Sequence, residues 1–225
     1  MIGGLGPEST IDYYRSILVR YRARKPDGGY PHILINSLDV DKGLAMLEAG
    51  RPEELADYLS AGVEALVRVG ADFGFVAANT PHLVFDEVQR RSAIPLLSIV
   101  RATVDRAQAL GLKKVGLFGT GFTMRASFYP DEFQRAGIAL AIPTESERNF
   151  IHGKYIGELL KNQFLPQTRE AILRIAQRMK AEDGVEAIVL AGTELPLLLR
   201  DSTPDIEFLD TTVIHVEAVV DELLR

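Results

Sequence analysis

The chain has 225 residues, of which 47% are hydrophobic and 25% are charged, and its net charge at pH 7 is −6. This size allows one or two domains, and the acidic balance argues against a broad surface for nucleic acid. No cysteine is present, no apolar run approaches a membrane span, and no secretory signal precedes the globular pattern, so a cytoplasmic protein without disulfides or membrane contact is the default expectation.

The first half of the chain alternates apolar runs with helical patterns. It opens on a glycine-rich loop, Gly3–Thr10, preceded by only two residues, so either the first strand is short or the natural chain begins upstream. The predicted elements that follow are a helix with Ile11, Tyr14, Ile17, Leu18 and Tyr21 at helical spacing, a strand over 32–36, a loop or short helix over 37–50, a helix over 53–69, strands over 73–76 and 95–98, and helices over 83–91 and 99–110.

Two turns of similar construction follow apolar strands. The first, residues 77–82, reads Ala-Ala-Asn-Thr-Pro-His, and the second, residues 191–196, reads Ala-Gly-Thr-Glu-Leu-Pro. In the first turn the Thr80 hydroxyl is expected to cap the next helix, with Pro81 at its first position. Backbone N–H groups at such a helix start attract carboxylates and phosphates. The pair of turns therefore suggests two half-sites for one anionic ligand.

The second half repeats the order of the first. Strand ends at Gly4, Ala78 and Ser98 find counterparts at Gly119, Gly192 and Asp210, at a near-constant offset. This indicates two α/β/α domains with mainly parallel sheets, over 1–98 plus 211–225 and over 99–210. The predicted elements are strands over 115–118, 138–142, 187–190 and 206–209, a loop over 119–123, and helices over 125–136, 147–161, 167–182 and 211–224.

Polar residues gather after the predicted strands, where ligands bind in open parallel sheets. They are Ser9, Thr10, Asn36, Ser37, Asn79, Thr80, Ser98, Thr120, Thr123, Thr144, Glu145, Thr193, Glu194 and Asp210.

Four stretches together resemble the aspartate/glutamate racemase family, in the order that the family has them. They are residues 3–10 with Tyr13 and Tyr14, residues 79–82, residues 151–157 with Tyr155, and residues 193–196. The resemblance covers nearly the whole chain. It implies two pseudo-symmetric domains with the site in the cleft between them, racemisation of an amino acid without pyridoxal phosphate, metal or other cofactor, and a homodimer. It also implies substrate binding by Ser9, Thr10, Asn79, Thr80, Thr120, Thr123, Thr193 and Glu194.

The chain departs from this family at its proton carriers. Family racemases place one cysteine before the Asn-Thr of the first turn and another before the Thr-Glu of the second, and here those positions hold Ala78 and Gly192. The basic positions that bind the substrate carboxylate are also altered: Lys42 is the candidate in the first domain, and Leu159 falls where some members carry lysine. The resemblance therefore implies the binding cleft more strongly than the thiol chemistry.

Other side chains are candidates to carry the proton, because acid–base work needs a group whose pKa can be tuned towards neutrality. These candidates are His82, Glu194, Glu145 and Asp210. Several site candidates have a structural alternative: Thr80 and Thr193 as helix caps, His82 as a core residue, and Glu194 as a partner of a helix dipole. The four histidines lack metal-ligand spacing, and the Gly3–Thr10 loop lacks a nucleotide-binding pattern.

Three functions remain open on the sequence. The first is a racemase-type isomerase with non-thiol proton carriers. The second is a related reaction that needs one base, such as one-sided proton transfer, decarboxylation or elimination. The third is a carboxylate-binding protein without catalysis. Hydrogen exchange at Cα, with or without inversion, would distinguish them.

Overall fold

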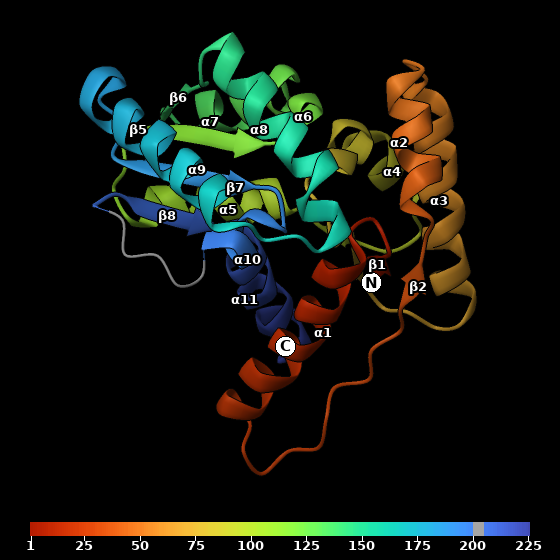
Figure 1. Cartoon of the computed structure of the whole chain (residues 1–225). Helices are drawn as coiled ribbons and strands as arrows, with labels where there is room; N and C mark the ends of the chain where they lie inside the picture. Colours follow the sequence, from red (N-terminus) through yellow and green to blue (C-terminus); the bar gives the residue numbers. More distant parts are fainter. Residues whose placement is uncertain (200–204) are drawn as a thin grey trace. The chain divides into compact units, whose positions relative to one another are not determined.

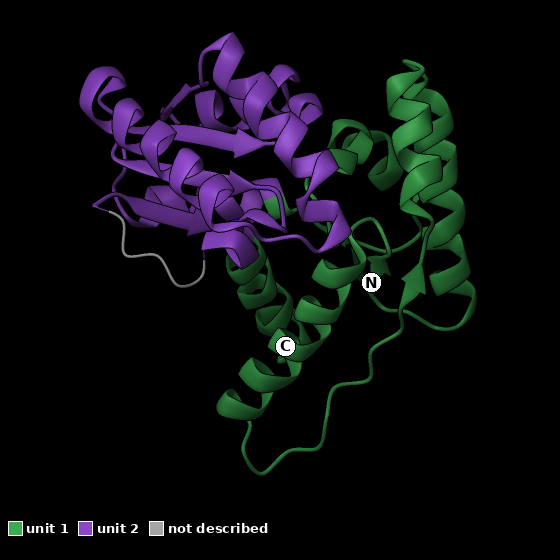
Figure 2. Cartoon of the chain, viewed as in Figure 1, with its two compact units in different colours: residues 1–99, 212–225 green, residues 100–211 purple. Residues whose placement is uncertain are grey.

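Residues 1–199 and 205–225 are described by a computed structural model, in which the chain divides into two units (Figure 2). Unit 1 comprises Met1–Ile99 and Thr212–Arg225, and unit 2 comprises Val100–Thr211. Unit 2 is therefore an insertion between the two parts of unit 1, and each unit has its own strands and its own hydrophobic core.

The strands of unit 1 are β1 (Ile2–Gly3), β2 (Asn36–Ser37), β3 (Gly74–Phe75) and β4 (Leu96–Leu97). They pair in parallel, β1 with β2 and β3 with β4, and a single bridge between Ile2 and Val76 joins the two pairs. The order across unit 1 is thus β2-β1-β3-β4.

These strands are shorter than the sequence pattern predicts. A strand is expected over 32–36, whereas β2 begins at Asn36. β1 begins at Ile2, and Met1 before it donates its terminal amino group to Leu34 O at 2.8 Å and accepts from Asn36 N at 3.0 Å through its carbonyl. The first strand is short, as the two residues that precede Gly3 lead one to expect.

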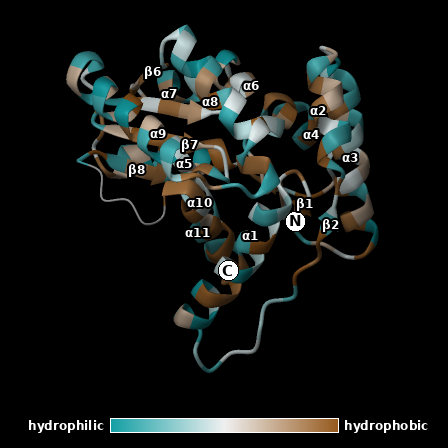
Figure 3. Ribbon diagram, in the orientation of Figure 1, coloured by the Kyte–Doolittle hydropathy of each residue, from teal (hydrophilic) through white to brown (hydrophobic). Residues whose placement is uncertain are grey.

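The helices of unit 1 are α1 (Pro7–Arg24), α2 (Val40–Glu48), α3 (Pro52–Arg68), a 3₁₀ helix (Thr80–Val84), α4 (Phe85–Arg91) and α11 (Thr211–Leu223). Hydrophobic residues alternate with hydrophilic ones along α3 at helical spacing (Figure 3), as expected of a helix with one buried face. That face carries Leu55, Leu59 and Val63, which pack with Ile2 and Val76.

The buried face of α1 agrees with the predicted one at Ile17 and Tyr21 but not at Ile11 and Tyr14. Its core residues are Tyr13, Ile17 and Tyr21, which pack with valines of α11, whereas Ile11 and Tyr14 are exposed. Apolar residues lie on two sides of α1, so helical periodicity fits either side. The contact with α11, which comes from the far end of the chain, decides which side is buried.

The strands of unit 2 are β5 (Lys114–Gly119), β6 (Ala139–Ala141), β7 (Ala187–Ala191) and β8 (Glu207–Asp210). They form one parallel sheet in the order β6-β5-β7-β8 (Figure 1). The helices are α5 (Ile99–Ala109), α6 (Gly121–Arg125), α7 (Phe128–Arg135), α8 (Glu145–Gly157), a 3₁₀ helix (Leu159–Lys161), α9 (Pro166–Arg178), a π-helical turn (Met179–Asp183) and α10 (Leu195–Leu199).

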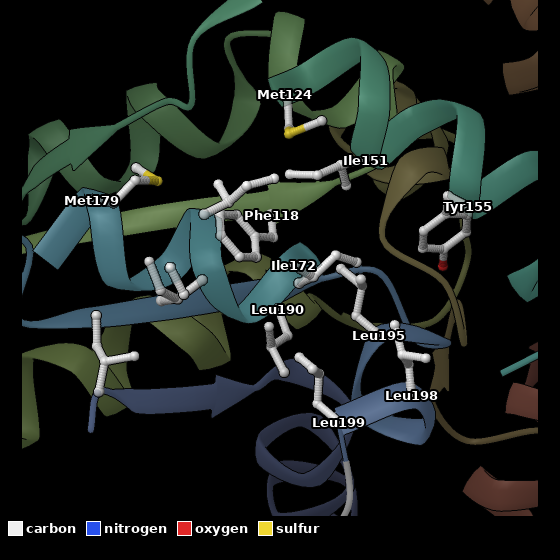
Figure 4. Close-up of a cluster of buried hydrophobic side chains, with 14 of the residues drawn as sticks. Phe118, Met124, Ile151, Tyr155, Ile172, Met179, Leu190, Leu195, Leu198 and Leu199 are labelled. Carbon is white, nitrogen blue, oxygen red and sulfur yellow. The ribbon is translucent and has the colours of Figure 1, made fainter. Parts of the chain in front are cut away.

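A dense core supports the sheet of unit 2. Phe118 and Leu190 of the central strands meet Ile151 and Tyr155 of α8 and Ile172 of α9 (Figure 4). Continuous apolar runs in β5 and β7 are expected of parallel strands that are covered on both faces.

The two units share one topology. In each, the first strand lies between the second and the third, and the fourth lies at the edge beyond the third. The helix after the fourth strand belongs largely to the other unit: α5 follows β4 into unit 2, and α11 follows β8 into unit 1. The predicted α/β class with parallel sheets is confirmed, and the common strand order explains the sequence repeat.

Candidate functional site

In unit 1, the turn after β3 contains the buried residues Ala78, Asn79 and His82, with Thr80 half-buried. Thr80 is the first residue of the 3₁₀ helix, and Asn79 precedes it with a helical backbone and no side-chain cap. The expected Thr80 cap is therefore wrong. Because the turn tightens directly into a 3₁₀ helix, Thr80 lies inside the helical turn rather than ahead of it.

The imidazole of His82 is bonded to backbone on both sides. The Ile99 N–H donates to Nε2 at 3.2 Å, so Nδ1 carries the hydrogen and donates it to the Ala78 carbonyl at 3.0 Å. The ring also stacks on Phe85, with centroids 4.7 Å apart. His82 thus connects the turn after β3 with the start of α5 through hydrogen bonds. This is the structural role that the sequence analysis gave as the alternative to catalysis.

The glycine-rich loop after β1 is fixed by Thr10. Its Oγ1 accepts from Gly4 N at 2.8 Å and donates to Gly6 O at 3.1 Å. Gly4 has φ +80°, and a Cβ there would lie 2.0 Å from the Leu38 carbonyl oxygen, so only glycine fits. Ser9 is buried in the first turn of α1. The Thr10 hydroxyl therefore shapes the loop around the end of β1.

In unit 2, the residues after β5 form a helix start and not the predicted loop. Thr120 is the N-cap of α6, and its Oγ1 accepts from Thr123 N at 3.2 Å and lies 3.2 Å from Thr123 Oγ1. The Gly121 N–H donates to Nδ1 of His152 at 3.0 Å. The predicted helix over 125–136 is likewise divided, because α6 ends at Arg125 and α7 begins at Phe128.

The turn after β7 holds a buried carboxylate. Oε2 of Glu194 accepts hydrogen bonds from the hydroxyls of Tyr155 and Thr193, the second at 3.0 Å. The Glu194 N–H in turn donates to the Tyr155 hydroxyl at 3.5 Å. All three residues are buried. Burial, and then the neighbouring Glu194 carboxylate, raise the pKa of Tyr155 well above its usual value, so its hydroxyl holds its proton at neutral pH.

Tyr155 occupies the place where a side chain at position 192 would begin. A Cβ built on Gly192 would lie 2.4 Å from Cε2 of Tyr155 and 3.0 Å from its Cζ and Oη. Figure 4 shows Tyr155 at the edge of the unit 2 core, with its hydroxyl oxygen in red. The sequence pattern placed Tyr155 on the helix that carries part of the resemblance but not in the site, and the signal for its place was the glycine at position 192.

The orientation of Tyr155 depends on the start of α8. Thr144 and Glu147 form a reciprocal capping box there, in which Thr144 Oγ1 accepts from Glu147 N and a Glu147 carboxylate oxygen accepts from Thr144 N. One helical turn before Tyr155, Ile151 faces the same core. The cap and the core contact together fix which side of α8 faces the core of unit 2.

The remaining candidates lie in different surroundings. Glu145 and Lys42 are exposed, Asp210 is half-buried at the end of β8, and Leu159 belongs to the core of unit 2. Within residues 1–199 and 205–225, no group of three His, Asp or Glu side chains is arranged to hold a metal ion. None of the helices in those same residues is long and apolar enough to cross a membrane.

Two α/β units of one topology, each with buried polar residues in the turn after its third strand, define a duplicated parallel α/β protein. The sequence matches the Asp/Glu/Hydantoin racemase family over residues 2–219, so the chain belongs to this family. The resemblance deduced from the sequence is thereby confirmed.

Individual proteins agree with this assignment. A Yersinia pestis protein assigned as an Asp/Glu racemase is 31% identical, with a TM-score of 0.89 over 100% of this chain and 97% of that one. An aspartate racemase homologue from Pyrococcus horikoshii is also 31% identical, with a TM-score of 0.81 over the same shares. The broad specificity amino-acid racemase RacX of Bacillus subtilis is 30% identical over 139 residues, which is 57% of each chain.

Proposed function

We propose that the protein binds a small amino acid or related carboxylate and catalyses cofactor-independent proton transfer at its Cα, as an isomerase. The observation that carries the proposal is the pair of equivalent turns after β3 and β7, where hydroxyl, amide and carboxylate side chains are held in buried surroundings. Family membership and the amino-acid racemase named among its relatives support the same substrate class.

Except for Glu194, whose carboxylate accepts hydrogen bonds, the proposed binding groups are hydrogen-bond donors with little formal charge. They are Ser9, Thr10, Asn79, Thr80, Thr120, Thr123, Thr193 and Glu194. Hydroxyls and backbone N–H groups at helix starts suit a carboxylate. The small residue Ala78 leaves room for a substrate somewhat bulkier than aspartate, whereas the Tyr155 ring fills the space beside Gly192.

We infer that Ala78 and Gly192 stand where the family carries its two thiols, since the chain has no cysteine and both positions directly precede the matching polar pairs. Neither side chain can accept a proton. The reaction therefore needs a proton carrier of another kind. Glu194 is the candidate, because its buried carboxylate accepts hydrogen bonds from two side-chain hydroxyls.

A one-base reaction is the second candidate, and the hydrogen bonds of His82 favour it. His82 is the one titratable side chain of residues 77–82, and both of its ring nitrogens are bonded to backbone groups. Proton exchange with retention, or decarboxylation followed by one protonation, requires a carrier on one side only.

The test is calorimetry and Cα hydrogen exchange in deuterium oxide, against a panel of amino and keto acids. The variants Thr80→Val and Thr193→Val keep the shape of the side chain and remove its hydroxyl, and both are expected to weaken binding. Exchange with inversion identifies a racemase, and exchange with retention identifies the one-base reaction. Unchanged binding in both variants would contradict the proposed site.

We also propose a homodimer that forms through the outer face of α1. Ile11, Tyr14 and Val19 are exposed there, and Tyr30 of the following loop is exposed beside them. The Arg22 guanidinium lies 4.9 Å from the Tyr30 ring centroid and holds the loop against the helix. A contiguous apolar surface of this kind is typical of a protein–protein contact.

A further inference from the structure

The Tyr155 ring and a side chain at position 192 would occupy the same space. Any side chain at position 192 would begin 2.4 Å from the Tyr155 ring, well inside contact distance. The Tyr155 hydroxyl oxygen lies 3.0 Å from the Cβ position of such a side chain. A polar, proton-bearing group thus occupies the space beside the end of β7 that glycine leaves open.

The Tyr155 hydroxyl is part of a continuous hydrogen-bonded path. It donates to Oε2 of Glu194, which also accepts from Thr193 Oγ1 at 3.0 Å. Its oxygen accepts from the Glu194 N–H at 3.5 Å. These bonds fix the direction of the path, with the phenol as donor and the carboxylate as final acceptor.

We propose that Tyr155 and Glu194 form a proton relay that acts at the substrate Cα in place of a thiol at position 192. This inference rests on the proposed function and adds Tyr155 as the group that faces the reacting carbon. A single proton carrier at this position is sufficient for hydrogen exchange on one face of the substrate Cα.

The relay conserves charge and protons. When the Cα–H bond breaks, its electron pair remains on the substrate as an enolate of the carboxylate. Tyr155 Oη receives that proton while its own proton passes to Oε2 of Glu194, which leaves a neutral phenol and a neutral carboxylic acid. In the reverse step Glu194 returns a proton to Tyr155 as Tyr155 gives one to Cα.

The relay explains why the tyrosine does not act alone. Burial and the Glu194 carboxylate raise the pKa of Tyr155, so a free phenolate beside the carboxylate is strongly disfavoured. Transfer through the hydroxyl avoids a phenolate in both directions. The negative charge leaves Glu194 at the moment when it appears on the substrate, so the buried turn never holds two new charges.

The experiment measures deuterium incorporation at Cα by proton NMR, with the L- and D-forms of the proteinogenic amino acids as probes, and measures binding of the same probes by calorimetry. The variants are Tyr155→Phe and Glu194→Gln. Tyr129→Phe is the matched control, because Tyr129 is also a buried tyrosine of unit 2 with a side-chain hydrogen bond, to Thr103, outside both turns. Circular dichroism shows whether each variant is folded, and Glu194→Gln tests the relay should Tyr155→Phe fail to fold.

The expected result is a loss of exchange of about 100-fold or more in Tyr155→Phe and in Glu194→Gln, the usual contribution of a positioned acid or base. Binding should change only a few-fold, and Tyr129→Phe should exchange as the wild type does. Exchange that persists in folded Tyr155→Phe overturns the relay and leaves the proposed function intact. A wild-type protein that neither binds nor exchanges any probe overturns the proposed function, and one that binds without exchange overturns proton transfer and the relay together.

Discussion

Tyr13 and His215, 202 positions apart in the chain, share a buried hydrogen bond in which the Tyr13 hydroxyl donates to His215 Nδ1 across 2.9 Å. On the other side of the ring, Nε2 donates to the Leu97 carbonyl at 3.2 Å. Both bonds require the neutral imidazole, because a second ring proton would face the hydroxyl that donates to Nδ1. Burial lowers the pKa of His215 from 6.5 to about 4.

This pKa makes stability depend on pH. The unfolded chain takes up a proton as pH falls below 6.5, whereas the folded protein does so only near pH 4, so acid favours unfolding between these values. We expect the free energy of unfolding to be constant with respect to His215 above pH 6.5 and to fall by about 3 kcal/mol towards pH 4. Urea unfolding at a series of pH values measures this slope.

The matched variants separate His215 from other groups. His215→Gln should flatten the slope between pH 4.5 and 6, although it lowers stability overall. His32→Gln, at an exposed histidine, should leave the slope unchanged. Glu147, Glu158 and Glu186 have pKa values lowered by their hydrogen-bond partners. The stability that these carboxylates contribute is therefore lost at pH values below the range in which the slope is compared. A slope retained in His215→Gln would contradict the assignment.

Restoring a side chain at position 192 should cost stability through Tyr155. Gly192→Cys places its Cβ 2.4 Å from a buried ring whose hydroxyl is bonded to Glu194, so we expect a loss of about 1–3 kcal/mol. Tyr155→Leu removes the obstructing ring edge. In a double-mutant cycle by chemical denaturation, the two changes together should cost less than the sum of their separate costs. Additive costs would mean that Tyr155 moves aside without penalty.

Charge on the outer face of α1 should separate the proposed dimer. Val19 of α1 and Val69 at the end of α3 have nearly equal exposure, 63% and 62%, but only Val19 lies beside the apolar residues that we propose as the dimer contact. Val19→Glu should give a monomer by light scattering after gel filtration, whereas Val69→Glu should leave the mass unchanged. A wild-type monomer at micromolar concentration would refute the proposal.

Two glycines of unit 1 share a left-handed backbone but differ in their surroundings. Gly4 has φ +80° and Gly70 has φ +89°, yet a Cβ at Gly4 would meet the Leu38 carbonyl oxygen at 2.0 Å, whereas one at Gly70 would meet nothing within 4 Å. Gly70→Ala should cost about 1–2 kcal/mol from backbone strain alone. Gly4→Ala should cost at least about 1 kcal/mol more, from the clash. Thermal unfolding of both variants measures the difference, and equal costs would contradict it.

Local patterns were sufficient for the class of fold. Apolar runs followed by polar turns predict parallel α/β units, and the repeat of Ala78 at Gly192 predicts that the two units share a topology. The patterns located the turns at Asn79 and Thr193 because strand, turn and helix start are adjacent in the chain.

Contacts between distant segments account for what the sequence did not predict. The place of Tyr155 beside Gly192 depends on how α8 packs in the core of unit 2, and the buried side of α1 depends on α11. The hydrogen bond between His82 and Ile99 likewise joins two elements whose separation no periodicity reveals. Each is set by three-dimensional packing, for which a single sequence contains no local signal.

The helix α11, which belongs to unit 1, is synthesised after the whole of unit 2, and this sets the order in which the two cores can form. Unit 2 lies in one uninterrupted stretch, so it can complete its core as soon as residue 211 has left the ribosome. Unit 1 is begun first but lacks the valines of α11 that cover Tyr13 and Ile17. During synthesis these side chains remain uncovered while more than a hundred further residues are added, so the core of unit 1 is completed only after that of unit 2.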